Sequence, residues 1–169
     1  MDNEELKNKI NQTITEISSL RGWIITKSID IDSYIGAIIN NYFVLSNRQS
    51  DFTTIVMSDP YFSSGLKISI LNKIHNKLNW NSYVGFKKDL YRINELRNRF
   101  AHSVPFGFEG HLSYSAGEKP IKIKKAKEMY DEFMNLYSKI LEELDKIFCF
   151  LVEESRKREN SVTKIAPDI

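Results

Sequence analysis

The feature that most constrains this chain is a long stretch of helical spacing near its C-terminal end. Between Lys124 and Glu154, apolar residues recur every three or four positions, which is the period of one helix face. A helix of roughly 30 residues spans about 45 Å, which is longer than a domain of this size needs. We therefore predict a helix over residues 124–154, part of which packs on another subunit. Its buried side should carry Ala126, Met129, Tyr130, Phe133, Leu136, Tyr137, Ile140, Leu141, Leu144, Ile147, Phe148, Leu151 and Val152.

The same spacing runs through most of the remaining chain. It predicts a helix that ends near residue 20, with a short break or a kink at Arg21-Gly22, and a second helix from residue 23 to about residue 44. A third helix is capped by Ser63 or Ser64 and runs until Asn79, and a fourth runs from near residue 85 to residue 102. After His102 the period changes, and residues 111–114 and 121–123 read as the two strands of a small hairpin. The sequence therefore predicts the all-α class: an up-and-down helical bundle of four to five helices with a small β-hairpin insertion before the last long helix.

Length and charge limit the domain organisation. With 169 residues and 41% hydrophobic content, the chain is long enough for one well-buried domain and too short for two. We predict a single domain over residues 1–154 and a mobile basic tail over 155–169, where no apolar period continues. A formal charge of +2 does not by itself indicate a nucleic-acid binder, so any basic surface must come from local clustering.

Several classes of protein and of site are not favoured by the sequence. The single cysteine, Cys149, excludes an internal disulfide and fits a reducing compartment. No charged-then-apolar leader and no long uncharged apolar run is present, so we expect a cytoplasmic protein that does not contact a membrane. One cysteine and three scattered histidines make a poor metal site, and neither a phosphate-binding glycine loop nor a nucleophile elbow is found. We expect no metal and no cofactor.

The predicted helix over residues 85–102 carries the pattern that points to function. An ideal helix turns by about 100° per residue, and this rotation places Arg97 inside an apolar face. A guanidinium cannot lose its charge and is costly to bury unpaired, so Arg97 needs a carboxylate, a bound anion or a wet cleft between subunits. Asp30 and Asp32 are candidate structural partners, while Asn98 and His102 lie one turn apart on the polar flank. The apolar face consists of Phe86, Leu90, Ile93, Leu96, Phe100 and Ala101.

These residues support two interpretations. In the functional one, Arg97 and His102 form an anion site where the helix ends beside a glycine-containing segment. In the structural one, Arg97 pairs with Asp30 or Asp32 inside a bundle, and His102 caps the last carbonyls of its helix. Structural ion-pair networks also bury charges, so the residues alone leave both interpretations open.

This helix contains an arginine that is followed by a polar residue and, after four residues in all, by a histidine, in the run Arg97-Asn98-Arg99-Phe100-Ala101-His102. The run resembles the signature of the HEPN superfamily. The similarity extends over residues 20–150 and is nearest to the mannitol-repressor-like and HEPN toxin branch. The resemblance implies a helical bundle that forms a homodimer through the Arg97–His102 helix, with two copies of the motif facing each other across a cleft. It rests further on Arg21-Gly22-Trp23, Ile31-Asp32, Tyr42-Phe43 and Ser64-Gly65-Leu66-Lys67, which occur in that order.

The resemblance also implies an activity. Many HEPN proteins are metal-independent endoribonucleases, acting as toxins or antiviral defence effectors, in which the RNA 2′-hydroxyl attacks the adjacent phosphate and leaves a 2′,3′-cyclic phosphate. Carried onto this chain, His102 would be the general base or acid. Arg97 would hold the scissile phosphate and offset its developing charge, and Asn98 would position His102 or a phosphate oxygen. An antitoxin or a nucleotidyltransferase is a possible partner of such a protein.

Other residues are candidates for contact with RNA. Arg99 points about 200° away from the Arg97 face, so we expect a surface or RNA-backbone contact there. The basic run Lys122, Lys124 and Lys125 suits phosphates, and Tyr91 suits stacking on a base. An ordinary solvated surface or simple packing explains each of these residues equally well.

Two alternatives to the ribonuclease stay open at this point. One is a non-catalytic HEPN regulatory or protein-interaction module, such as a mannitol-repressor-like transcriptional regulator, in which Arg97 is an interface residue. The other is a purely structural bundle in which Arg97 pairs with Asp30 or Asp32.

Overall fold

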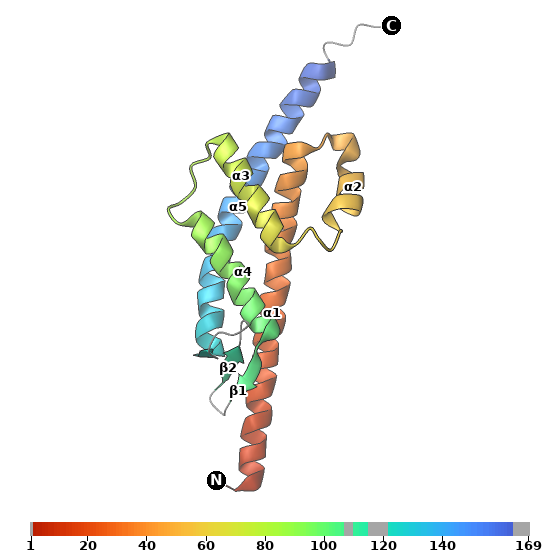
Figure 1. Cartoon of the computed structure of the whole chain (residues 1–169). Helices are drawn as coiled ribbons and strands as arrows, with labels where there is room; N and C mark the ends of the chain where they lie inside the picture. The colour runs from red at the N-terminus through yellow and green to blue at the C-terminus, as the bar shows by residue number, and fades with distance from the viewer. Residues whose placement is uncertain (1, 107–109, 115–121, 164–169) are drawn as a thin grey trace. The chain divides into compact units, whose positions relative to one another are not determined.

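The computed structural model describes residues 2–106, 110–114 and 122–163. It confirms the all-α class with a small β insertion before the last helix (Figure 1). In chain order the elements are α1 (Asn3–Phe43), a 3₁₀ turn (Ser46–Arg48), α2 (Gln49–Phe52), a π-helical turn (Thr53–Met57), α3 (Ser64–Leu78), α4 (Phe86–His102), β1 (Val104–Phe106), β2 (His111–Tyr114), β3 (Lys122–Lys125) and α5 (Ala126–Thr163).

Helix α1 is continuous where the sequence allowed a break or a kink. Gly22 lies inside it, and a Cβ added there would meet nothing within 4 Å, so no close packing demands a glycine. A glycine in a helix interior costs about 0.5–1 kcal/mol relative to alanine. Ile17 and Ile24, on either side, are buried to 2% and 0% exposure, and this packing outweighs the local preference.

The predicted hairpin is part of a three-stranded antiparallel sheet in the order β1-β2-β3. Strand β1 was missed, because its central Pro105 reads as a break rather than as a strand. Proline has no N–H to donate and is tolerated on an edge strand, which is where β1 lies. Leu112 of β2 lies opposite Pro105 and Lys124 and is buried, so one face of the sheet covers the core. Ile121, the first residue of the predicted second strand, lies outside the described residues.

Helix α5 differs from its prediction at both ends. It begins at Ala126 and continues past Glu154 to Thr163, so the first part of the predicted tail is helical. Lys157 Nζ donates to Glu154 Oε1 at 2.9 Å, an i,i+3 pair that supports this last part of the helix. Ser155 Oγ also donates to the carbonyl of Asn41 at 3.4 Å. Residues 164–169 of the predicted tail lie outside the described residues.

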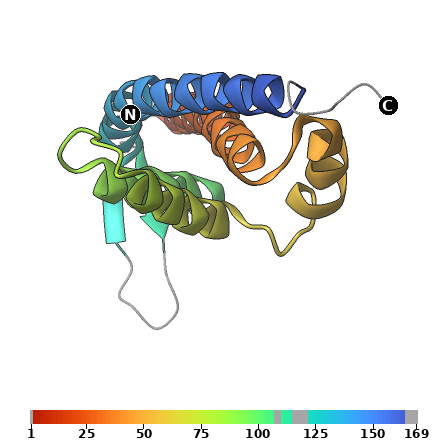
Figure 2. The same ribbon diagram turned by 90° about the horizontal axis from the view of Figure 1, so that it is seen from above.

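The chain forms two compact units, and α1, α4 and α5 contribute residues to both. The first unit consists of residues 1–30 and 91–138, and the second of residues 31–90 and 139–169. In the second unit, residues 46–57 form short turns beside the end of α1 (Figure 2). Asn40 of α1 binds these turns, because its Nδ2 donates to the carbonyl of Gln49 at 3.2 Å and to Thr53 Oγ1 at 2.9 Å. The predicted single domain over residues 1–154 stays a prediction.

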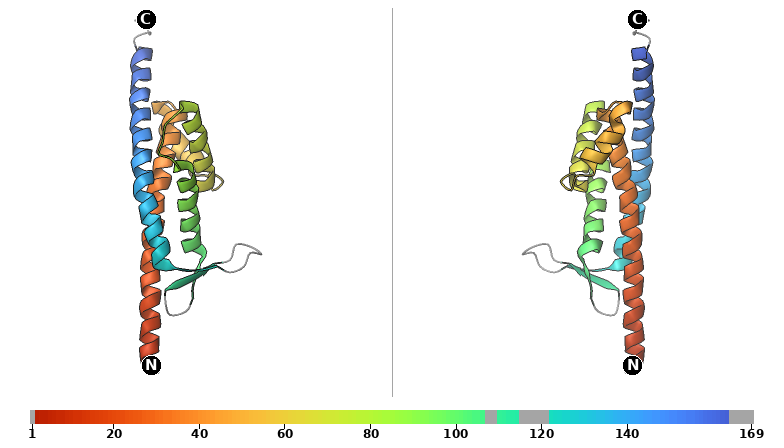
Figure 3. Two further views of the ribbon diagram at one scale, coloured as in Figure 1. Left: turned by 90° about the vertical axis from the view of Figure 1, so that its left-hand side faces the viewer. Right: turned by 90° about the vertical axis from the view of Figure 1, so that its right-hand side faces the viewer.

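The first unit contains the predicted motif. Its sheet lies at the end of α4, and the first turns of α1 extend past the sheet (Figure 3). Apolar side chains from α1, α4, β2 and α5 meet in its core. They are Ile17, Ile24, Ile93, Leu96, Phe100, Leu112, Ala126, Met129, Phe133 and Tyr137.

Candidate functional site

The second half of α4 positions the candidate residues. Ile93, Leu96 and Phe100 recur at the spacing of one helix face and are buried to 3%, 0% and 0% exposure. This buried stripe fixes the rotation of α4 about its axis. Asn98 and His102, which lie off the stripe and one turn apart, are consequently exposed.

Arg97 lies at the edge of the buried stripe and is half-buried. Its guanidinium NH1 donates a hydrogen bond of 2.8 Å to Oδ1 of Asn98, the next residue in the helix. The structure thus brings Arg97 and Asn98 into contact, and His102 follows on the same exposed side of α4. No ion pair of Arg97 is found among the residues that the structure describes.

Asp30, the first predicted structural partner of Arg97, has other donors. Its Oδ2 accepts from Tyr137 Oη at 2.9 Å and from Lys27 Nζ at 3.3 Å. Burial raises the pKa of Tyr137 above its ordinary value, and the bond to Asp30 adds to this effect. These contacts of Asp30 form a small cluster between α1 and α5, and the hydrogen bond of Arg97 described above goes to Asn98 instead of to this candidate partner. A long arginine side chain at the edge of an apolar face reaches out to a polar partner, so it does not require a buried carboxylate.

Asp32, the second predicted partner, forms an ion pair with a lysine instead. Its Oδ2 lies 2.5 Å from Lys67 Nζ, and both residues belong to the second unit. The link therefore joins α1 to α3, and it gives Asp32 a structural role in that unit.

Arg99 is the clearest departure from the predicted site. It was expected at the surface, but it is only 8% exposed, and its NH2 pairs with Glu95 one turn earlier. The helix rotation does turn Arg99 away from Arg97. A helical wheel cannot show, however, that a second part of the fold covers that side of α4. A role for Arg99 as an exposed RNA-backbone contact is not supported by this burial.

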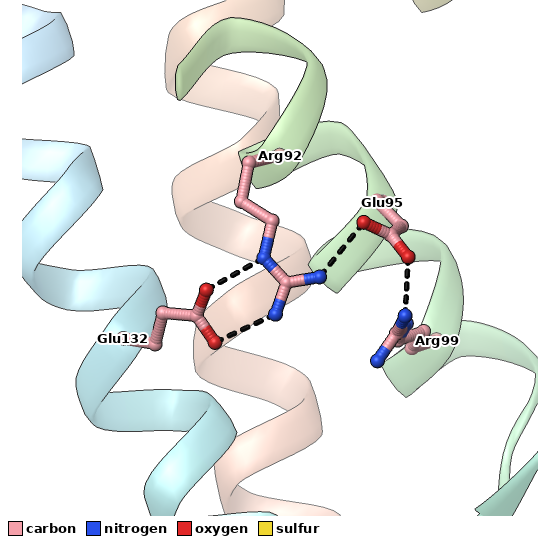
Figure 4. Close-up of polar contacts among 4 residues, drawn as sticks. All are labelled: Arg92, Glu95, Arg99 and Glu132. Carbon is pink, nitrogen blue, oxygen red and sulfur yellow. Dashed lines mark hydrogen bonds and ion pairs between the residues drawn. The ribbon is translucent and has the colours of Figure 1, made fainter. Parts of the chain in front are cut away.

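A network of two arginines and two glutamates joins this side of α4 to α5 (Figure 4). Arg92 holds the carboxylate of Glu132 through two parallel bonds, from Nε at 2.6 Å and from NH2 at 2.7 Å. Its NH1 donates to Glu95 Oε2 at 2.7 Å, and Glu95 also accepts from Arg99. A planar guanidinium matches a carboxylate in this fork geometry, which makes the α4–α5 contact directional as well as attractive.

The network changes the acidity of its carboxyl groups. The hydrogen bond from Arg92 holds the pKa of Glu132 below its usual range, against the opposing effect of burial. Burial raises the pKa of Glu95, but bonds from Arg92 and Arg99 outweigh this effect and leave that pKa lowered as well. Both carboxylates are therefore stabilised in their charged form.

Sequence reasoning missed this network. The spacing of Arg92, Glu95 and Arg99 by three and four positions is a signal for pairing along one helix. Nothing local pointed to Glu132, which lies on another helix.

The remaining candidates lie in the same unit as Arg97. Tyr91 of α4 is 45% exposed, and Lys124 and Lys125 of β3 are exposed. Lys124 is near enough to the carboxylate of Glu132 to lower its pKa further. Lys122 is the first residue of β3.

Arg21 of α1 contacts the end of α4 and was not predicted as a site residue. Its NH2 donates to the carbonyl of Ser103 at 2.9 Å, across 82 positions of sequence. Ser103 directly follows His102 and is 6% exposed. No pattern in the sequence marks this contact.

In residues 2–106, 110–114 and 122–163, no group of three or more histidine, cysteine, aspartate or glutamate side chains is arranged to hold a metal ion. No helix within these ranges has the length and apolar content needed to cross a membrane. Comparisons with models of protein families, with curated proteins and with solved structures find no match.

Proposed function

We propose that this protein is a HEPN-type metal-independent endoribonuclease, a toxin or antiviral defence effector, with its site at a homodimer cleft formed around Arg97, Asn98 and His102. The observation that carries the proposal is the state of the three arginines of α4. Arg92 and Arg99 are paired with carboxylates, whereas Arg97 donates to the neutral amide of Asn98.

The positive charge of Arg97 is therefore not compensated by a carboxylate within the described part of the chain. The imidazole of His102 is exposed at the end of the same helix. Cleavage of a phosphodiester by an internal hydroxyl needs a proton acceptor and a fixed positive charge close together. A positive charge without a carboxylate partner, on a helix that ends in an exposed histidine, supports a site for an anionic substrate more than it supports a structural ion pair.

The reaction follows from the roles of these side chains. The imidazole of His102 takes the proton of the RNA 2′-hydroxyl, and O2′ forms a bond to phosphorus while the bond from phosphorus to O5′ breaks. Arg97 donates to the non-bridging oxygens, where negative charge grows. The leaving O5′ takes a proton, which the second copy of the motif supplies in the dimer. The products end in a 2′,3′-cyclic phosphate and a 5′-hydroxyl.

Asn98 has a supporting role in this scheme. Its Oδ1 accepts from the guanidinium of Arg97 and so limits the directions in which Arg97 can donate. The exposed Lys124 and Lys125 would bind the RNA backbone, Lys122 would extend this basic strand, and Tyr91 would stack on a base.

The test is RNA cleavage by the purified protein in EDTA, with analysis of the product ends. We expect 2′,3′-cyclic phosphate ends from the wild type, and loss of cleavage in His102→Ala and Arg97→Ala with unchanged circular dichroism. Lys87→Ala is the matched control, because it removes an exposed cation from the same helix outside the motif. Light scattering should report a dimer.

Two outcomes would overturn the proposal. One is cleavage by His102→Ala at the wild-type rate. The other is a folded, dimeric wild type that cleaves no RNA, which would favour the non-catalytic regulatory or interaction module instead.

A further inference from the structure

His102 is exposed, and it is the last residue of α4. The final carbonyls of a helix have no partner within the helix, and helix ends fray. A general base must nevertheless be held within a fraction of an ångström of its working geometry. Some other part of the molecule therefore has to fix the end of α4.

Arg21 of α1 makes the contact that does this. Its NH2 donates to the carbonyl of Ser103, the residue directly after His102, at 2.9 Å. The Oγ of Ser103 in turn donates to the carbonyl of Phe100 at 3.4 Å. The chain is thus held on the far side of His102, at the point where α4 gives way to β1.

Arg21 is half-buried, and the partner of its NH2 is a backbone carbonyl. Its Nε is buried and has no hydrogen-bond partner, and no carboxylate within the described ranges pairs with its guanidinium. A buried N–H donor without a partner costs free energy, so stability alone does not favour this arrangement.

A second set of contacts holds the same part of α4 from the side of α5. Arg92 joins Glu132 of α5, and Glu95 connects Arg92 to Arg99 one turn further on (Figure 4). These bonds fix the rotation of the helix. They run as far as Arg99, three residues before the end of the helix, whereas Arg21 contacts Ser103, directly after that end.

We propose that Arg21 is a positioning residue for His102, an inference that rests on the proposed function. By fixing the carbonyl of Ser103, Arg21 prevents the last turn of α4 from fraying and keeps the imidazole of His102 in place relative to Arg97. It acts through the backbone and does not touch the RNA.

The experiment compares Arg21→Met, which keeps the length of the side chain and removes its donors, with Arg21→Lys, which keeps the charge and one donor group. Lys27→Met is the matched control, because Lys27 lies on the same helix and bonds to Asp30 instead. The first readout is the NMR signal of the His102 Hε1 proton at constant pH, assigned by its disappearance in His102→Gln. The second readout is hydrogen exchange at the amides of residues 103–105. The third is kcat and KM for RNA cleavage.

In Arg21→Met we expect a displaced or broadened His102 signal and faster exchange at residues 103–105. We expect kcat to fall by about 10- to 100-fold while KM changes by less than about twofold, because misplacement of a catalytic group acts on the chemical step. Arg21→Lys should recover most of each effect, and Lys27→Met should leave the His102 signal unchanged.

The outcomes separate this inference from the proposed function. An unchanged His102 signal in folded Arg21→Met overturns the positioning role, whether or not the wild type cleaves RNA. A displaced signal together with an inactive wild type overturns the ribonuclease proposal, while the structural coupling of Arg21 to His102 stands. If Arg21→Met does not fold, Arg21→Lys decides the question. A wild-type kcat in Arg21→Lys together with an altered His102 signal would refute the inference, because displacement of the imidazole would then have no effect on the chemical step.

Discussion

Replacing Glu132 by glutamine should weaken the link between α4 and α5 without creating a cavity. Glutamine has nearly the same shape but cannot accept both parallel bonds from Arg92, which measure 2.6 and 2.7 Å. The side chains of Arg92 and Glu132 are 24% and 39% exposed, so solvent screens the pair in part. Exposed pairs contribute about 0–1 kcal/mol and hydrogen bonds to charged groups about 1.5–3 kcal/mol.

Because Arg92 keeps its bond to Glu95, we expect a value between these two ranges, a decrease of about 1–1.5 kcal/mol in the free energy of unfolding. For a chain of this length, such a decrease lowers Tm by about 2–6 °C. The assay is urea unfolding followed by circular dichroism at 222 nm. A double-mutant cycle with Arg92→Met should give a coupling energy of about 1 kcal/mol.

The matched control is Glu142→Gln. Glu142 also accepts from a cation, Lys146 at 2.7 Å, but this pair lies along one helix with side chains 71% and 53% exposed. We expect no measurable decrease of stability in the control. Equal unfolding midpoints for Glu132→Gln and Glu142→Gln would refute the view that the α4–α5 network stabilises the unit.

Three further predictions follow from the same unit. Glu95 and Glu132 both have a lowered pKa in the folded state, so their contribution to stability is present above about pH 4.3 and is lost as the pH falls through their folded-state pKa values. The wild type should therefore lose more stability than Glu132→Gln in an unfolding series from pH 5 to about pH 2.5, and parallel curves would contradict this prediction. Phe100→Ala should cost about 3–5 kcal/mol in urea unfolding, because Phe100 is fully buried, and a cost below about 1 kcal/mol would show that α4 does not form part of the core. Replacing Lys124 and Lys125 by glutamine should reduce the salt dependence of binding to 2′-O-methyl RNA, measured by fluorescence anisotropy, by about 0.7 in log–log slope for each phosphate that is no longer neutralised, and an unchanged slope would remove both lysines from the RNA surface.

Much of the helical architecture could be predicted from the sequence, because a helix imposes its period on the residues that make it. The spacing of Ile93, Leu96 and Phe100 identified the buried face of α4, and these residues are buried. In α5, the predicted apolar positions Met129, Phe133 and Ile140 are buried for the same reason. Such patterns are local, so they can be read without knowing what the helix packs against.

The ends and interruptions of the elements were predicted less well. Gly22 marks a preference against helix of about 0.5–1 kcal/mol, which the packing of Ile17 and Ile24 outweighs. Pro105 reads as a break, yet pairing with β2 gives it a place on an edge strand. In each case tertiary contacts decided against a weak local signal.

By itself the sequence determined most of the helical architecture, the buried stripe of α4 and the placing of Arg97, Asn98 and His102 together near one helix end. Only the tertiary structure decided how each charge is balanced. Arg99 is buried against Glu95, Arg92 takes Glu132, and Arg97 has the amide of Asn98. The reason is physical: rotation along a helix depends on neighbouring residues alone, whereas the partner of a charge depends on which side chain the fold brings within about 3 Å.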